Sequence, residues 1–293
     1  MKALVFALAP LTQNLKGVVQ ALKVFRKHKG KFTTLHVFGS PEETNILKDN
    51  KDFEIHAVSK ESIAEEAETF ALSLNAPLIL LGERSALVES LAAHLTPIEG
   101  KKPVLGLLLP SAVYNHSVFL VDVGANTEQT SGDLESEFEA AKAFEEKILL
   151  LKGPRFGLLY PGKPTPTSLS AAFDLVHHSD PRYCGIVSPS DILKGQYDLL
   201  VGESLLMTAS LESAKGNLKT LLDFESTEVN KSVFFKFGRW WLRDVQKTMQ
   251  SRFDSSYYAN GLYFLNYPIP VIGLEPSVNY GAITNALELS LRF

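Results

Sequence analysis

Short apolar runs, many of them β-branched, recur along the whole chain, and helical patterns separate most of them. Several runs are apolar at every position, as expected for strands that helices cover on both faces. Strand–helix alternation of this kind predicts an α/β sheet with substantial parallel pairing. The predicted strands are Lys2–Leu8, Phe32–Phe38, Leu78–Gly82, Val104–Leu109, Val118–Val123, Phe156–Tyr160, Gly185–Val187, Asp198–Val201 and Pro270–Leu274.

The segments between these strands carry apolar residues at helical spacing. Neither an internal repeat nor a low-complexity linker interrupts the alternation. We therefore expect a single domain over residues 1–293, with a helical excursion around 229–252. The predicted helices are Leu15–Arg26, Ile63–Leu74, Ser85–His94, Asp133–Leu150, Ser168–His177 and Leu205–Leu222.

Charge and cysteine content exclude some classes of protein. The 293 residues carry a net charge of −4, which argues against nucleic-acid binding through overall charge. The single cysteine, Cys184, allows no intramolecular disulfide and no zinc site built from thiolates, so a reducing cytoplasm is expected. Cys184 lies in an apolar run and is predicted to be a small buried hydrophobe.

Two uncharged stretches resemble membrane or targeting segments. The apolar run after Lys2 is broken by Pro10 and lacks a clear cleavage site, which favours a buried strand over a signal peptide. The stretch from Pro103 to Val121 has polar residues at its centre, which favours two strands joined by a turn over a transmembrane helix.

Two loops at predicted strand ends have residues suited to a site, because ligands in such sheets bind beyond the carboxyl ends of the strands. In one loop, Gly124 permits a close approach to the backbone or a positive φ. Asp122 and Asn126, on either side of it, offer polar side chains at the strand end. The alternative is a plain turn that caps the next helix. In the other loop, Gly82 precedes Arg84 and Ser85 at a helix start, where N–H groups favour an anion. The alternative is that Arg84 is only a solvated charge.

The common signatures of nucleotide-binding, α/β-hydrolase and metallopeptidase sites are absent from the sequence. His177 and His178 are adjacent and have no acidic or cysteine partner at ligand spacing, so they are interpreted as helix-end residues. The sequence therefore predicts no metal site.

The segment 229–252 predicts a basic amphipathic helix rich in aromatics. At about 100° per residue, cations occupy one stripe and apolar side chains the opposite one. Such a helix suits an anionic bilayer or a partner protein, and the alternative is that its aromatic face packs in the core or a dimer interface. The stripes are Lys236, Arg239, Arg243 and Lys247 on one side and Phe234, Phe237, Trp241, Val245 and Thr248 on the other.

Three segments, in order along the chain, match a known pattern. Val121–Asn126 resembles L-D-V-G-A-N of the PlsX phosphate acyltransferases, and Pro154–Leu159 with Gly162 resembles their P-R-V-G-L-L-N-x-G. Gly185–Ile192, followed by Gly195, Asp198 and Val201, is similar to G-N-V-E-G-R-D-I-x-x-G-x-x-D-V-V-V. Weaker similarity covers nearly the whole chain.

The resemblance implies a three-layer α/β/α sandwich of the isopropylmalate-dehydrogenase-like type, with a mostly parallel sheet, in a homodimer. It implies transfer of a fatty acyl group from acyl carrier protein to inorganic phosphate, giving the acyl phosphate used in phospholipid synthesis. No metal or organic cofactor takes part in that reaction. The family is cytoplasmic and docks on the membrane through an apolar helical tip, in roughly the region of residues 229–252.

On this resemblance, Arg84 and Ser85, with Gly82, are expected to hold phosphate. The thioester and the carrier arm are expected to be oriented by Asp122, Asn126, Asn260, Ser277 and Asn279. No residue is assigned as general base.

Several of the family's glycine-rich loops are replaced in this chain. The segments that differ are Ala7–Pro10, Gly82–Ser85, Glu203–Glu212 and Glu275–Asn279. Loss of these glycines motivates the alternative of a non-catalytic relative that acts as a membrane-associated scaffold or binds acyl carrier protein. A further alternative is an acyl-phosphate-forming enzyme that uses short-chain acyl-CoA.

Overall fold

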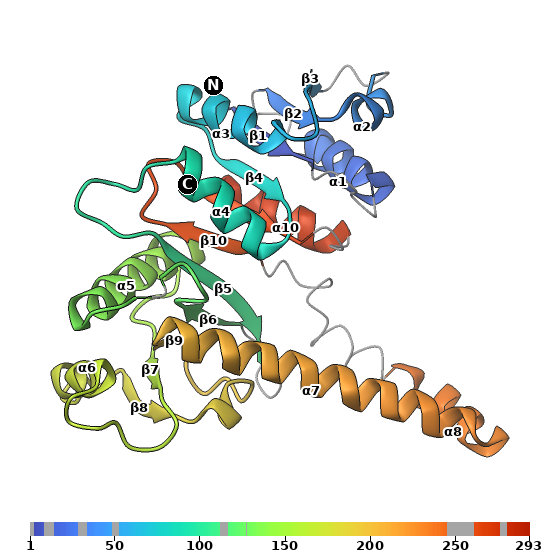
Figure 1. The fold of residues 1–293 in the computed structure, drawn as a ribbon. Coiled ribbons are helices and arrows are strands. Elements are labelled where there is room, and N and C mark those ends of the chain that lie inside the picture. Colours follow the sequence, from blue (N-terminus) through green and yellow to red (C-terminus); the bar gives the residue numbers. More distant parts are fainter. Residues whose placement is uncertain are drawn as a thin grey trace.

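The computed structural model describes residues 3–8, 15–28, 34–48, 53–111, 117–126, 128–244, 261–275 and 280–293. The strands of this part form a single sheet in the order β3-β2-β1-β4-β11-β10-β5-β6-β9-β7-β8 (Figure 1). The strands are β1 (Leu4–Ala7), β2 (Leu35–Gly39), β3 (Phe53–Ala57), β4 (Leu78–Leu81), β5 (Val104–Pro110), β6 (Ser117–Val121), β7 (Phe156–Leu159), β8 (Tyr183–Val187), β9 (Leu199–Gly202), β10 (Leu262–Leu265) and β11 (Val271–Leu274).

The sheet consists of two parallel halves that run in opposite directions. Strands β3, β2, β1, β4 and β11 pair in parallel, and so do β6, β9, β7 and β8. Between the halves, β10 is antiparallel to both β11 and β5, and β5 is antiparallel to β6. The carboxyl ends of the strands in one half therefore lie beside the amino ends of the strands in the other half.

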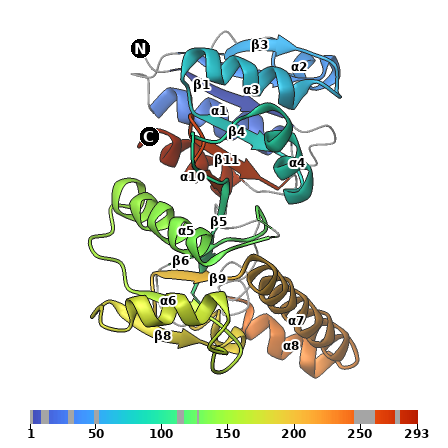
Figure 2. The same ribbon diagram turned by 60° about the vertical axis from the view of Figure 1, so that its left-hand side comes forward.

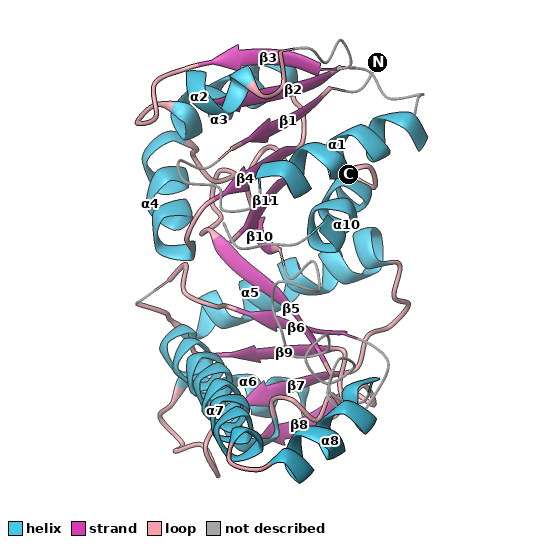
Figure 3. Ribbon diagram, turned by 90° about the vertical axis from the view of Figure 1, so that its right-hand side faces the viewer, coloured by secondary structure: helices cyan, strands magenta, loops and turns pink. Residues whose placement is uncertain are grey.

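Helices cover both faces of the sheet, which gives three layers (Figure 3). Side chains alternate between the two layers of core: Leu4 and Phe6 of β1 pack on one face, and Val5 and Ala7 on the other. One face is covered by α1 (Leu15–His28), α5 (Ser131–Phe144), α6 (Leu169–His177) and α10 (Tyr280–Ser290), and the other by α3 (Ile63–Leu74), α4 (Arg84–His94) and α7 (Ser204–Asn230).

Two further helices lie at the periphery. The short helix α2 (Pro41–Asn45) starts with a capping box between Ser40 and Glu43. The helix α8 (Val233–Trp241) follows α7. The C-terminal part of α7 and α8 together form an arm that projects from the body of the sheet (Figures 1 and 2). Ser232 caps its start by accepting a hydrogen bond from the N–H of Phe234.

The fold class predicted from the sequence is confirmed, whereas two local expectations are wrong. Residues 229–252 do not form one helix, because the helical conformation is interrupted at Lys231 and Ser232, between α7 and α8. Cys184 is exposed, not buried. No helix in the described ranges is long and apolar enough to span a membrane.

Candidate functional site

The first turns of α7 lie between the two loops that the sequence analysis singled out. Ser204, Thr208 and Glu212 follow one another at intervals of four residues, which places them on one stripe of the helix. At about 1.5 Å per residue this stripe extends roughly 12 Å. It starts beside the loop that follows β6 and ends beside the start of α4.

The loop after β6 is held by the carboxylate of Asp122. Its oxygens accept hydrogen bonds from the backbone N–H groups of Leu105 (2.9 Å), Ala125 (3.0 Å) and Asn126 (2.8 Å). Burial raises the pKa of Asp122, and these backbone N–H groups act in the opposite direction. Asp122 therefore fixes the shape of the loop.

The side chain of Asn126 extends the network into α5. Its amide donates to the carbonyl of Pro103 (2.8 Å) and to Glu137 Oε1 (3.1 Å). Gln129 donates to the other oxygen of Glu137 (2.6 Å) and accepts from the backbone N–H of Ser204 (2.7 Å), which caps the start of α7. Burial raises the pKa of Glu137 to about 8. The network fixes the loop relative to α7.

Thr208 and Gly124 face each other inside this frame. Gly124 has φ +118°, and a Cβ atom at this glycine would lie 3.5 Å from Thr208 Oγ1. That hydroxyl is buried and has no hydrogen-bond partner in the part of the chain that the structure describes. A buried hydroxyl without a partner is costly, so an acceptor that reached it would be favoured.

The second cluster begins where β4 ends. The helix α4 starts at Arg84, and the preceding Glu83 makes no side-chain capping hydrogen bond. Arg84 Nη2 donates to Glu212 Oε1 at 3.1 Å and so joins α4 to α7. The guanidinium is thus paired through Nη2 with an acid, which competes with an anion for the same positive charge.

The expected site residues separate into two groups. Gly82, Arg84 and Ser85 follow β4, whereas Asp122 and Asn126 follow β6. Because β4 and β6 run in opposite directions and three strands separate them, the groups lie at opposite strand ends of the sheet, and α7 contacts both. Asn260, Ser277 and Asn279 lie outside the described residues.

Sequence reasoning missed the groups that connect these loops, namely Thr208, Gln129 and Glu137. The helical spacing of Ser204, Thr208 and Glu212 is the one signal in the sequence that could have indicated their common face.

The face of α7 opposite to Ser204, Thr208 and Glu212 lines an apolar groove of about 660 Å³. The opposite wall comes from the short helical turn η2 (Pro189–Asp191) and the residues after it. The groove is lined by Pro189, Ser190, Ile192, Leu193, Leu206, Ala209, Ser210, Ser213, Ala214, Asn217 and Leu221. Its volume and lining suit a small apolar ligand or part of a longer chain.

The arm ends in an apolar surface on α8, which we call the aromatic tip. Phe234 is 87% exposed and Trp241 73% exposed, so these rings do not pack into the core of this chain. The members of the tip are Phe234, Phe237, Trp240, Trp241 and Leu242. Arg243 beside them is also exposed. Lys236 and Arg239 belong to α8, and Lys247 lies outside the described residues.

Within the described ranges, one group of His, Cys, Asp or Glu side chains has the spacing of metal ligands. It consists of His36, Glu54 and His56 on β2 and β3, at the edge of the sheet and outside the clusters above.

The fold is similar to that of solved phosphotransacylases. The branched-chain phosphotransacylase from Enterococcus faecalis V583 superposes with a TM-score of 0.58 at 16% identity, over 99% of this chain and 98% of that chain. A 4-hydroxythreonine-4-phosphate dehydrogenase from Burkholderia phymatum gives a TM-score of 0.52 at 9% identity, over 99% of this chain and 98% of that chain. At these identities the likeness shows the fold alone.

The family follows from the sequence. The model described as "Fatty acid synthesis protein" matches residues 76–292, and the chain belongs to that family. It is 25% identical to the phosphate acyltransferase of Dictyoglomus thermophilum, over 96% of this chain and 89% of the relative. It is 26% identical to that of Synechococcus elongatus, over 72% of this chain and 63% of the relative. The predicted resemblance to the PlsX phosphate acyltransferases is thereby confirmed.

Proposed function

We propose that this chain transfers a fatty acyl group from acyl carrier protein to inorganic phosphate and releases an acyl phosphate for phospholipid synthesis. Its family membership supports this proposal, as do its relatives named phosphate acyltransferases. The structural observation that carries it is the stripe of α7 from Ser204 to Glu212, which joins the start of α4 to the loop with Gly124.

Phosphate binds at the start of α4 in this proposal. The uncapped N–H groups of the first turn and the helix dipole favour an anion, and Arg84 adds a charged donor. Ser85 and the backbone after Gly82 lie in the same turn. The pair between Arg84 and Glu212 opens when phosphate takes the place of the carboxylate.

The thioester lies along α7, near Thr208. A phosphate oxygen attacks the carbonyl carbon, the C–O bond to phosphate forms, and the C–S bond breaks to release the carrier thiol. The hydroxyl of Thr208 is the group placed to donate to the carbonyl oxygen as negative charge develops there. Asp122 and Asn126 hold the loop in place, and we propose that Asn260, Ser277 and Asn279 complete the site.

The apolar groove between α7 and η2, on the side of α7 away from Thr208, is proposed to receive part of the acyl chain because its volume and apolar lining suit one. The aromatic tip is proposed to rest on an anionic membrane, which brings the product close to the lipid enzymes that use it. We also propose that the protein is cytoplasmic and that it forms a homodimer. The molar mass in solution tests the dimer directly.

The decisive experiment measures loss of thioester from long-chain acyl carrier protein with and without phosphate, and identifies the product as acyl phosphate by mass spectrometry. Turnover that requires phosphate supports the proposal. Binding of acyl carrier protein without turnover contradicts it and supports a scaffold. Turnover with short-chain acyl-CoA alone identifies a different acyl-phosphate-forming enzyme.

A further inference from the structure

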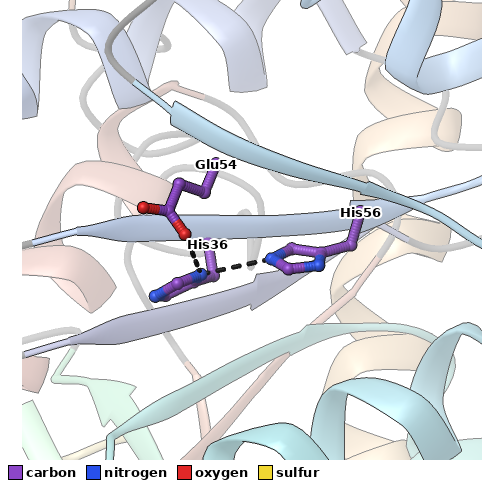
Figure 4. Close-up of side chains that lie close together, drawn as sticks. All are labelled: His36, Glu54 and His56. Atoms are coloured by element: carbon purple, nitrogen blue, oxygen red, sulfur yellow. Dashed lines mark hydrogen bonds and ion pairs between the residues drawn. The ribbon is translucent and has the colours of Figure 1, made fainter.

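Two histidines and a glutamate lie close together on the edge strand β3 and its neighbour β2. In the parallel pairing of β2 with β3, His36 lies opposite Glu54 and Phe38 opposite His56. Directly opposed residues share a face, and so do residues two apart on a strand. His36, Glu54 and His56 therefore point to the same side of the sheet, as Figure 4 shows.

The distances between their polar atoms are those between ligands of one metal ion. His36 Nδ1 lies 3.2 Å from His56 Nε2 and 3.3 Å from Glu54 Oε2. Zinc bonds of about 2.0–2.1 Å in a tetrahedral arrangement separate two ligand atoms by roughly 3.3 Å. All three donor atoms lie within 4.8 Å of one another, and the exposed side chain of Glu54 is free to rotate toward His56.

Aromatic rings hold the imidazoles in place. Phe38 stacks on His56 with ring centroids 4.3 Å apart and an interplanar angle of 7°. Phe70 of α3 meets His36 edge-on at 4.7 Å and His56 at 5.0 Å. A ligand pair whose ring orientation is fixed by packing loses little freedom when it binds an ion.

The charges around the histidines also favour a cation. Burial lowers the pKa of both His36 and His56, which favours the neutral imidazole whose lone pair binds a metal. The carboxylate of Glu54, on β3, acts on both imidazoles, that of Glu66, on α3, acts on His56, and the ring of His56 acts on His36. Two negative charges beside two neutral imidazoles suit a divalent ion.

We propose that His36, Glu54 and His56 form a zinc site that fastens the edge strand β3 to β2. Imidazole with a carboxylate is a common ligand set for zinc, and water completes the coordination on the exposed side. The site is separate from the proposed acyl transfer and does not depend on it. The histidines are twenty positions apart in sequence, on two neighbouring strands, so no motif in the sequence indicates the site.

The test uses the full chain without a histidine tag, freed of metal by a chelator. Wild-type protein is expected to bind one equivalent of Zn²⁺ by titration calorimetry, and Co²⁺ as probe should give the visible absorption of a low-coordinate site. His56→Gln and Glu54→Gln are each expected to weaken Zn²⁺ binding at least about tenfold. Zn²⁺ should raise the melting temperature of the wild type and not of these variants, because it binds the folded state only.

His178→Gln and Cys184→Ser are the controls, since both remove exposed metal-binding groups elsewhere on the surface. Both should bind Zn²⁺ like the wild type. Circular dichroism establishes that each variant is folded. Absence of saturable binding in the wild type, or equal binding in His56→Gln and Glu54→Gln, overturns the proposal.

Discussion

The guanidinium of Arg84 donates a hydrogen bond of 3.1 Å to the carboxylate of Glu212, which is 128 residues away in sequence. The pair joins the start of α4, in one parallel half of the sheet, to α7, which leaves the other half. Both side chains are partly exposed, so the pair contributes only about 0–1 kcal/mol to folding. Its main consequence is electrostatic, since Glu212 competes with any anion for the same guanidinium.

Removing that competition should strengthen phosphate binding. Glu212→Gln is expected to lower the KM for phosphate several-fold, whereas Arg84→Ala should raise it about tenfold or more, because a charge-assisted hydrogen bond to the anion is lost. The measurement is a phosphate titration at saturating acyl donor.

The control for this prediction is Glu42→Gln on α2. It removes the same charge from an exposed ion pair that Glu42 makes with Lys60. Its phosphate KM should equal that of the wild type. If Arg84→Ala leaves the phosphate dependence intact, the phosphate site is not at the start of α4.

A substitution of Thr208 distinguishes a catalytic role of its hydroxyl from a structural one. Thr208→Val removes a buried hydroxyl that has no protein partner among the described residues, so the free energy of unfolding should stay the same or rise slightly. If the hydroxyl donates to the thioester oxygen, kcat should fall about 100-fold.

Thr220→Val is the matched change on the same helix, where the hydroxyl donates to the carbonyl of Gly216. It should not alter kcat. An unchanged kcat in Thr208→Val would exclude this hydroxyl from the reaction.

The sequence predicted the sheet well because most strands are apolar runs with helices between them. It missed β3 and β10 for different reasons. β3, Phe-Glu-Ile-His-Ala, is only partly buried at the edge of the sheet, and its polar residues Glu54 and His56 interrupt the apolar run that would have indicated a strand. β10 is antiparallel and lies in a hairpin with β11, outside the strand–helix alternation.

The site was less predictable, because its two loops belong to halves of the sheet that run in opposite directions. The sequence identified Arg84 and Asp122 separately, and nothing local shows that α7 links them. The ion pair with Glu212 and the contact between Gly124 and Thr208 arise only from tertiary packing. Helix boundaries after residue 229 were also wrong, because the cap at Ser232 restarts the helix in a sequence with continuous helical periodicity.

Narrowing the apolar groove should change the preference for acyl chain length. Ala214 lines the groove on α7, and Ala214→Phe would fill part of its volume of about 660 Å³. Turnover of long-chain acyl carrier protein is expected to fall several-fold relative to that of short-chain substrates. The measurement is kcat/KM against chain length. Parallel losses at every chain length would place the acyl chain elsewhere.

The aromatic tip should bind vesicles that contain anionic lipid. Replacing Phe237 and Trp241 by Glu is expected to abolish co-flotation, because each ring contributes about 1.5–3 kcal/mol on burial. Leu175→Glu is the control, since Leu175 is at least as exposed but lies on α6. Flotation that survives the double change at the tip, or is lost in the control, contradicts the assignment of the tip.

Two buried carboxyl groups should make the protein less stable as the pH rises. Burial raises the pKa of Glu137 to about 8 and of Glu145 to about 9. Between the unfolded pKa, near 4.5, and these values, the folded state holds protons that the unfolded state has lost. The free energy of unfolding therefore falls with pH over this window, by up to about 1.4 kcal/mol per pH unit for each group.

Glu145 is the better group to change, because neither of its oxygens has a hydrogen-bond partner in the described ranges. Glu145→Met is expected to flatten the dependence between about pH 5 and 9 and to raise stability most at the alkaline end. Denaturant unfolding across this range measures the effect. Glu99→Gln removes an exposed carboxylate that is not among the groups acting on Glu145 and should leave the slope of the wild type. Parallel curves for wild type and Glu145→Met would show that Glu145 is ionised in the folded protein, since only a carboxyl that keeps its proton on folding produces the slope.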